Sequence, residues 1–193
     1  MVTRGSTLTR LLDAVDEVVF VEGATHAPVD AILERAGVSP ATLYRAYPSK
    51  DALVAAALER RHEEWLEVWD AAIARASTDR DRLLAVFDAL EEYAGRTTGA
   101  RWCAFLGTAA GHVDPDPVLA AAVRLETDEL RARLRRLAEP VVGTDAPRLV
   151  EALLLVYSGR LAMRLRAPER GVGAPSSRAV AGLLIDQPDR LGS

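Results

Sequence analysis

The sequence predicts an all-α protein, and two observations support this. Apolar residues recur every three to four positions along most of the chain, which is the spacing of an amphipathic helix. The alternation of polar and β-branched residues that is typical of strands is scarce, and no Asn-Gly hairpin turn occurs. The composition, with 49% hydrophobic and 27% charged residues, is that of a chain that buries a core.

Four helices are expected in the first third of the chain, separated by glycine and proline residues. Gly23 ends the first helix. Pro28 is expected at the first position of the second helix, which ends before Gly37. Ser39 is placed to cap a short third helix, and a long fourth helix follows. The expected ranges are about 8–21, 28–36, 40–46 and 50–76.

Five further helices follow at the same apolar spacing. The Gly- and Pro-rich stretch 168–175 is expected to be a loop before the last of them. A length of 193 residues allows one domain, or a small domain fused to a larger one. The expected ranges are about 79–93, 100–110, 117–137, 145–166 and 177–186.

Membrane, secreted and metal-binding proteins are disfavoured. No apolar run approaches the roughly 20 residues of a membrane span, and the first residues do not form a secretory signal, so a cytoplasmic protein is expected. Cys103 is the single cysteine, which excludes an intramolecular disulfide and a cysteine-based zinc site. The three histidines have no carboxylate or cysteine at ligand spacing, so neither a metal nor a cofactor is expected.

No catalytic motif stands out either. The chain has no Gly-rich phosphate loop that follows a strand, and no nucleophile elbow. A helical enzyme using His112 with Asp114 or Asp116 is supported only by the proximity of these residues in sequence. We therefore expect a protein that is not an enzyme.

The distribution of charge points to a small basic surface within an acidic protein. The net charge of −4 counts against nucleic-acid binding, because phosphate neutralisation dominates non-specific affinity. Residues 35–50, however, contain Arg35, Arg45 and Lys50 and no acidic residue. This local charge of about +3 is a small positively charged region of the kind that binds nucleic-acid phosphates. Lys50 is the one lysine in the chain.

The second and third expected helices form a candidate helix-turn-helix around Gly37. Such a corner presents its second helix to the DNA major groove, although many helical proteins contain one without binding DNA. The short helix and its flanks add hydroxyl and ammonium groups, which are the usual partners of phosphate oxygens. These groups belong to Ser39, Thr42, Tyr44, Tyr47 and Lys50.

Residues 36–53 contain three short motifs at fixed spacing. The run begins with the turn Ala-Gly-Val-Ser at 36–39, contains Thr-Leu-Tyr at 42–44, and ends with Tyr-Pro-Ser-Lys-Asp-Ala-Leu at 47–53. In this order the motifs resemble the signature of the TetR family of bacterial regulators. The resemblance covers about 8–53. It departs from the family pattern at Pro28, where a capping Ser or Thr is usual, and at Val19, where an aromatic residue is usual and Phe20 is displaced by one position.

The resemblance implies which residues contact DNA. Thr42, Tyr44 and Lys50 would contact the backbone, together with the flanking Ser39 and Tyr47, and Val38 and Leu43 would be buried with Ile32 and Leu53 to set the angle of the two helices. Arg45 is the choice for direct readout, because an arginine can bond to guanine O6 and N7 with two parallel bonds. The residues expected to face base edges are Pro40, Ala41 and Arg45.

The same resemblance implies a domain organisation, a homodimer and an effector. Residues 1–53 would form the DNA-binding domain, and residues 54–193 an effector-binding and dimerisation domain. A homodimer would bind a near-palindromic double-stranded operator as a repressor, and a small, largely apolar effector would release it. The last two helices would form the dimer interface through Leu149, Leu153, Val156, Met163 and Leu183.

The aromatic residues of the second part are candidates for the effector pocket. Such pockets are mostly apolar with a few polar groups, yet helical spacing makes core packing equally consistent for each residue. Cys103 admits a redox-sensing role as well as that of an inert core filler. The candidate pocket residues are Trp65, Trp69, Phe87, Trp102, Phe105, His112 and Tyr157.

One alternative function remains open from the sequence. A helical ligand-binding or interaction protein whose helix-turn-helix no longer engages DNA is compatible with the negative net charge and with Pro28. DNA binding itself separates the two hypotheses.

Overall fold

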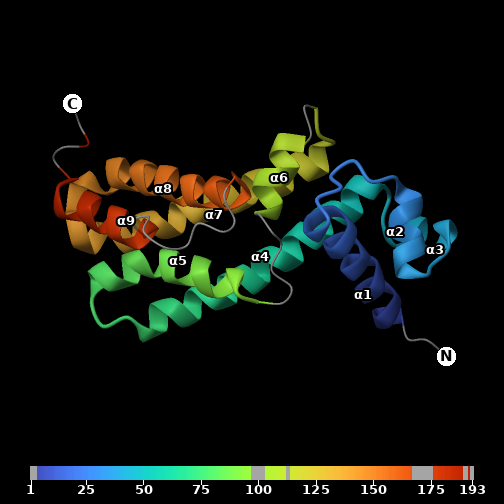
Figure 1. Ribbon diagram of the computed structural model, residues 1–193, viewed down its shortest axis with the longest axis horizontal. Helices are drawn as coiled ribbons and strands as arrows, with labels where there is room; N and C mark the ends of the chain where they lie inside the picture. The colour runs from blue at the N-terminus through green and yellow to red at the C-terminus, as the bar shows by residue number, and fades with distance from the viewer. Residues whose placement is uncertain (1–3, 97–102, 112–113, 167–175, 189–190, 192–193) are drawn as a thin grey trace. The chain divides into compact units, whose positions relative to one another are not determined.

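The computed structural model describes residues 4–96, 103–111, 114–166, 176–188 and 191. Nearly all of these residues are helical, and none of them lies in a strand, which confirms the all-α prediction. Figure 1 shows the helices. Their bounds are α1 Arg4–Val15, α2 Val29–Ala36, α3 Pro40–Ala46, α4 Lys50–Arg75, α5 Asp79–Ala94, α6 Ala104–Gly111, α7 Pro117–Val142, α8 Ala146–Arg166 and α9 Ser177–Asp186.

The helices form two compact units. Unit 1 comprises Met1–Glu63 with Ala100–Glu126, and unit 2 comprises Glu64–Gly99 with Thr127–Ser193. Unit 1 therefore contains α1 to α3, the first part of α4, α6 and the start of α7. Unit 2 contains the remainder of α4 and α7 together with α5, α8 and α9.

A single hydrophobic cluster holds unit 1 together. It joins Leu11 of α1, Ile32 of α2 and Leu43 of α3 to Leu58 of α4, all of them fully buried. Leu119 of α7 is also fully buried in this cluster. Burial of a leucine or isoleucine side chain stabilises the fold by about 1.5–3 kcal/mol, so this cluster fixes the first three helices on α4.

The structure departs from the expected helix bounds at several places, beginning with α1, which starts at Arg4 rather than near residue 8. The end of the first helix, Asp16–Val21, is π-helical rather than α-helical. Pro28 lies at the cap position before α2, with an extended backbone, and not at the first helical position. Helix α7 continues past the expected end near Leu137 to Val142 and includes Pro140, although a proline removes one helical hydrogen bond.

None of the described helices is long and apolar enough to cross a membrane. Within the described part of the chain there is also no group of three or more His, Cys, Asp or Glu side chains arranged to hold a metal ion.

Candidate nucleic-acid interface

The turn of the helix-turn-helix is set by Gly37 and Ser39. Gly37 adopts φ 61°, ψ 43°, a left-handed conformation that ends α2 and that other residues reach only with strain. Ser39 then caps α3, because its Oγ accepts a hydrogen bond from the backbone N–H of Thr42 at 3.3 Å. The hydroxyl groups of Ser39 and Thr42 are also hydrogen bonded to each other, at 2.9 Å.

The inner side of this corner is packed as predicted at three of the four residues expected to be buried. Ile32, Leu43 and Leu53 have no exposed surface. Val38 is only partly buried and packs at the edge of the same cluster. Leu43 therefore packs one face of α3 against the core of unit 1, and the opposite face of α3 is exposed to solvent.

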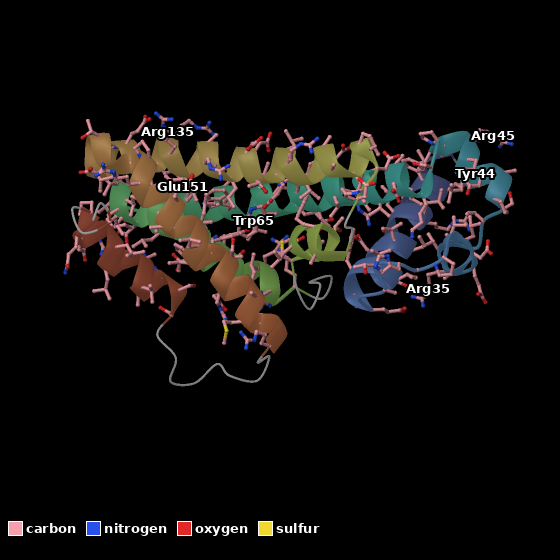
Figure 2. All side chains as sticks on the ribbon, turned by 90° about the horizontal axis from the view of Figure 1, so that it is seen from above. Arg35, Tyr44, Arg45, Trp65, Arg135 and Glu151 are labelled. Atoms are coloured by element: carbon pink, nitrogen blue, oxygen red, sulfur yellow. The ribbon has the colours of Figure 1, made fainter. Side chains whose placement is uncertain are left out.

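The outward face of α3 carries Tyr44 and Arg45. Tyr44 is 53% exposed, and Arg45, Pro40 and Ala41 are exposed as well. Figure 2 shows Tyr44 and Arg45 at the α3 end of unit 1, directed away from the core. Among the described residues neither side chain forms a hydrogen bond or an ion pair, so both groups are available to a partner.

Tyr47, which follows α3, is half-buried. Burial raises the pKa of the Tyr47 phenol above its usual value, and the nearby Arg60 opposes this shift. The phenol is therefore neutral at physiological pH and can donate its proton to an acceptor such as a phosphate oxygen.

Lys50 has a structural contact that the sequence did not predict. Its Nζ donates a hydrogen bond to the backbone carbonyl of Ala27, at 2.7 Å, and the side chain is half-buried. This bond ties the start of α4 to the segment that leads into α2. An ammonium group has three donors, so the contact with Ala27 leaves donors for a phosphate.

The cationic surface differs from the one expected from the sequence. Arg35 is neutralised by Glu17 at 2.7 Å and by Glu22 at 2.8 Å. Hydrogen bonds to these two carboxylates raise the pKa of Arg35 further. Arg35 therefore contributes little free positive charge.

Arg10 of α1 adds a cation that sequence reasoning missed. Its guanidinium donates a long hydrogen bond, 3.4 Å, to the carbonyl of Gly37 at the turn, and the side chain is exposed. Arg10 has no acidic partner among the described residues. Because Arg10 and Gly37 are 27 positions apart, only the packing of α1 on α2 reveals that this charge lies at the turn.

Ion pairs attach α1 and its π-helical end to α4. Asp16 accepts hydrogen bonds from Arg60 and from Nε of Arg61, the latter at 2.6 Å, and Asp13 pairs with Arg60 at 2.8 Å. The guanidinium of Arg61 is 5.2 Å from the ring centre of Phe20, and Arg61 is only 5% exposed. This cluster holds the helix-turn-helix scaffold on the first part of α4.

The residues predicted to form an effector pocket fall into separate groups. In unit 2, Trp65 lies against Trp69, Tyr93 and Tyr157 with ring centres 5.9, 5.8 and 6.2 Å apart. Trp65 is 7% exposed, and Figure 2 shows it directed into the interior. Tyr93 was not among the predicted residues. The aromatic cluster is thus buried and well packed.

The other predicted pocket residues are not part of this aromatic cluster. Phe87 is a buried core residue of α5 in unit 2. Phe105 belongs to unit 1, where its ring contacts that of His62 edge to face at 6.0 Å. Trp102 and His112 lie outside the described residues.

The apolar surface of α8 and α9 also differs from the predicted interface. Leu149 and Leu153 are fully buried in their own subunit, so the face that they form is not available to a partner. Val156 is half-buried. The large exposed apolar residues of these helices are Leu155 at 75%, Met163 at 49% and Leu183 at 64%. Of the five predicted interface residues, Leu149 and Leu153 therefore face the core of the chain, whereas Met163 and Leu183 are exposed as the prediction requires, and the exposed Leu155 was not among the five.

Cys103 is held in its neutral form. The residue as a whole is half-buried, but burial of the thiol, together with the negative charge of Glu126, raises the pKa of Cys103 to about 11. A thiol with this pKa is unreactive at physiological pH, because the thiolate is the reactive form. This favours the core filler over the redox sensor.

Comparison with known proteins identifies the helix-turn-helix. The family model for bacterial regulatory proteins of the tetR family matches residues 11–57. The transcriptional regulator BetI of Brucella anthropi is 28% identical over 170 residues, which cover 76% of this chain and 87% of BetI. BetI of Brucella canis is also 28% identical, over 76% of this chain and 85% of that protein.

Solved structures share the whole fold. A TetR regulator from Chloroflexus aurantiacus has a TM-score of 0.79 and 23% identity, covering 95% of this chain and 96% of its own. A TetR-family regulator from Streptomyces coelicolor has a TM-score of 0.76 and 23% identity, covering 98% and 89%. FadR of Bacillus subtilis, solved with stearoyl-CoA, has a TM-score of 0.70 and 14% identity, covering 93% and 96%. The motif, the matched family model and the BetI relatives together show that the chain belongs to the TetR family of transcriptional regulators and carries that family's DNA-binding helix-turn-helix.

Proposed function

We propose that this chain is a ligand-responsive repressor that binds a near-palindromic operator as a homodimer. The single observation that carries the proposal is the outward face of α3, where Tyr44 and Arg45 are exposed and have no partner among the residues that the structure describes, while Leu43 on the other face is buried. An arginine in this position can read a guanine in the major groove.

Backbone contacts come from the groups around α3. Ser39, Thr42, Tyr47 and Lys50 contact phosphates, and Arg10 adds a contact beside the turn. Arg35 does not, because Glu17 and Glu22 already pair with it. Residues 1–53 are assigned to DNA binding, and residues 54–193 to effector binding and dimerisation.

The homodimer forms through the exposed apolar face of α8 and α9. Leu155, Met163 and Leu183 supply its centre, since large apolar residues gathered on a surface are typical of protein interfaces. A two-fold dimer places its two α3 helices in successive major grooves, which explains a near-palindromic site.

The effector is a small, largely apolar molecule. The neighbour FadR was solved with stearoyl-CoA, which supports a ligand-responsive regulator without naming the ligand of this one. An effector releases the operator only if it binds one arrangement of the α3 helices more tightly than the other.

DNA capture tests the proposal. The purified full-length protein is mixed with genomic fragments, the retained fragments are sequenced, and affinity for the best fragment is measured by fluorescence anisotropy across a salt series. Enrichment of a near-palindromic site supports the proposal. Equal affinity for the retained and a scrambled fragment refutes it, and favours a ligand-binding protein that no longer uses its helix-turn-helix.

Lys50→Ala gives a second, residue-level test in the same assay. It is expected to reduce the salt slope by about 0.9, which is the contribution of one phosphate contact. Arg148→Ala is the matched control, because it removes one exposed positive charge from unit 2. Equal slopes for the two variants and the wild type would remove Lys50 from the interface.

A further inference from the structure

Unit 1 contains a cavity that the aromatic residues do not line. It has a volume of about 200 Å³ and lies between α6 and the start of α7. Its lining residues are Thr108, Ala109, Pro115, Leu119, Ala120, Val123 and Arg124.

The walls of this cavity are apolar except at two points. Leu119 is fully buried, and Val123 and Ala120 are half-buried. The hydroxyl of Thr108, a residue 2% exposed, adds one group that can donate or accept a hydrogen bond. Arg124 lies at the exposed end. An apolar body therefore fits the interior, and a polar group fits the end.

Arg124 selects an anionic group. Its guanidinium forms no ion pair or hydrogen bond within the described part of the chain, in contrast to Arg60 and Arg61 of the same unit, which pair with carboxylates. A planar guanidinium binds a carboxylate with two parallel hydrogen bonds. Such a bond at the end of an apolar cavity favours a ligand with one carboxylate over a neutral or cationic one.

No acidic residue is among the lining residues of the cavity. Asp116 accepts a hydrogen bond from the backbone N–H of Val118 at 2.9 Å and so caps α7. Along a helix Asp116 is roughly 12 Å from Arg124, so its charge does not neutralise the guanidinium. The ligand carboxylate is therefore directed to the Arg124 end.

The volume limits the size of the ligand. An engineered apolar cavity of about 150 Å³ binds benzene, whereas pockets for drug-sized molecules are about 300–1,000 Å³. A cavity of about 200 Å³ therefore accommodates one ring or a short branched chain.

We propose that this cavity binds a small aromatic monocarboxylate of the size of benzoate, with the carboxylate on Arg124 and the ring against Leu119 and Val123. The proposal rests on the proposed function in one respect, since this ligand is inferred to be the effector that weakens operator binding.

Two contacts connect the cavity to the DNA-binding helices. Leu119, in its wall, belongs to the same buried cluster as Ile32 and Leu43 of the helix-turn-helix. At the end of α6, a Cβ built on Gly111 would lie 3.0 Å from Cβ and Oγ1 of Thr25, in the segment before α2. A ligand that moves α6 by a few tenths of an ångström therefore changes the packing beside α2.

Ligand binding is tested first without DNA. Isothermal titration calorimetry of the full-length protein uses benzoate, benzyl alcohol and benzylammonium as probes. Benzoate is expected to bind at least tenfold more tightly than the other two. Arg124→Gln should weaken benzoate at least tenfold, and Arg148→Gln should leave it unchanged. Absence of benzoate binding at millimolar concentration, equal binding of benzyl alcohol, or an unaffected Arg124→Gln variant overturns the site.

Occupancy of the cavity itself is tested by Ala120→Phe, which fills it. Loss of benzoate binding with an unchanged circular dichroism spectrum is expected. Arg124→Gln keeps the site falsifiable if the larger side chain is not tolerated, because residue 124 is exposed.

The effector role is tested on operator DNA. Benzoate is expected to lower operator affinity at least fivefold in the wild type and to have no effect on Arg124→Gln. Gly111→Ala should lower operator affinity without ligand, and adding Thr25→Gly should restore it. Benzoate binding with unchanged operator affinity overturns the effector role alone, and absence of operator binding by the wild type overturns the proposed function while the calorimetric result stands.

Discussion

The ion pairs between α1 and α4 give a prediction whose size follows from burial. Asp16 is 18% exposed and bonds to Arg60 and to Arg61, whose side chain is 6% exposed. Removing one partner of a buried ion pair costs about 3–5 kcal/mol. Because Asp16 keeps some contact with water, we expect Asp16→Asn to lower the free energy of unfolding by about 2–3 kcal/mol.

Asp13→Asn is the matched control. Asp13 is 55% exposed and, within the described ranges, pairs with Arg60 alone, and exposed ion pairs contribute about 0–1 kcal/mol. At about 2–4 °C per kcal/mol for a chain of this length, Asp16→Asn should lower Tm by about 4–12 °C. Asp13→Asn should lower Tm by less than about 4 °C.

The assay is thermal unfolding followed by circular dichroism, with hydrogen exchange of the α1 amides as a local measurement. Faster exchange in α1 for Asp16→Asn, and not for Asp13→Asn, is expected. Equal Tm shifts and equal exchange in the two variants would refute the reasoning that burial of Arg61 makes this attachment strong.

Three further predictions follow from single contacts. Arg10→Ala should reduce the salt slope of operator binding by about 0.9, and Arg35→Ala should leave the slope unchanged. A lower slope for Arg35→Ala and an unchanged slope for Arg10→Ala would instead support the set of DNA-contacting charges expected from the sequence. The wild type should be a dimer by light scattering, and the double variant Leu155→Glu/Leu183→Glu a monomer, while Val118→Glu, also at an exposed apolar position, should remain a dimer; a dimer in all three proteins excludes this interface. The pKa of Cys103 is about 11, against 9.0 for an ordinary thiol, so native Cys103 should resist iodoacetamide at pH 8. The free energy of unfolding should fall as pH rises from about 9 towards 11, because the thiol ionises first in the unfolded chain. Rapid alkylation of the folded protein would contradict the burial of this thiol.

The local rules of helix formation predicted most of the fold. Ser39 caps α3 and Gly37 ends α2 as expected, because capping and left-handed turns depend on the residue itself and its nearest neighbours. The π-helical end of the first helix was not predicted. Its apolar spacing also fits an α-helix, and the bonds from Asp16 to Arg60 and Arg61 are contacts between residues far apart in sequence.

The candidate site was predicted less completely for the same reason. Arg35, Arg45 and Lys50 were counted together as free charge, yet Arg35 pairs with carboxylates of the first helix, and Lys50 bonds to a carbonyl before α2. These partners lie 13 to 23 positions away. Charge counted along a segment therefore overestimates the charge that a surface presents.

Apolar spacing likewise identifies the residues of a helix that are buried, but it does not say whether the same chain or a second copy covers them. The stripe that contains Leu149 and Leu153 was assigned to the dimer, and the structure places both residues in the core of the subunit. Leu155 was not selected because it falls outside that stripe. The exposed fraction of Leu155, 75%, becomes known only from the packing of α8 in the structure.

The central claim is that Arg45, which is exposed on α3, reads a base of the operator. The most direct measurement is the ratio of affinities for the operator and for random DNA of equal length, for the wild type, Arg45→Ala and Arg148→Ala at one salt concentration. We expect Arg45→Ala to lower this ratio by about 5- to 150-fold, which corresponds to about 1–3 kcal/mol of discrimination, and Arg148→Ala to leave it unchanged. Equal losses of Arg45→Ala on both DNAs would contradict the claim and make Arg45 a phosphate contact.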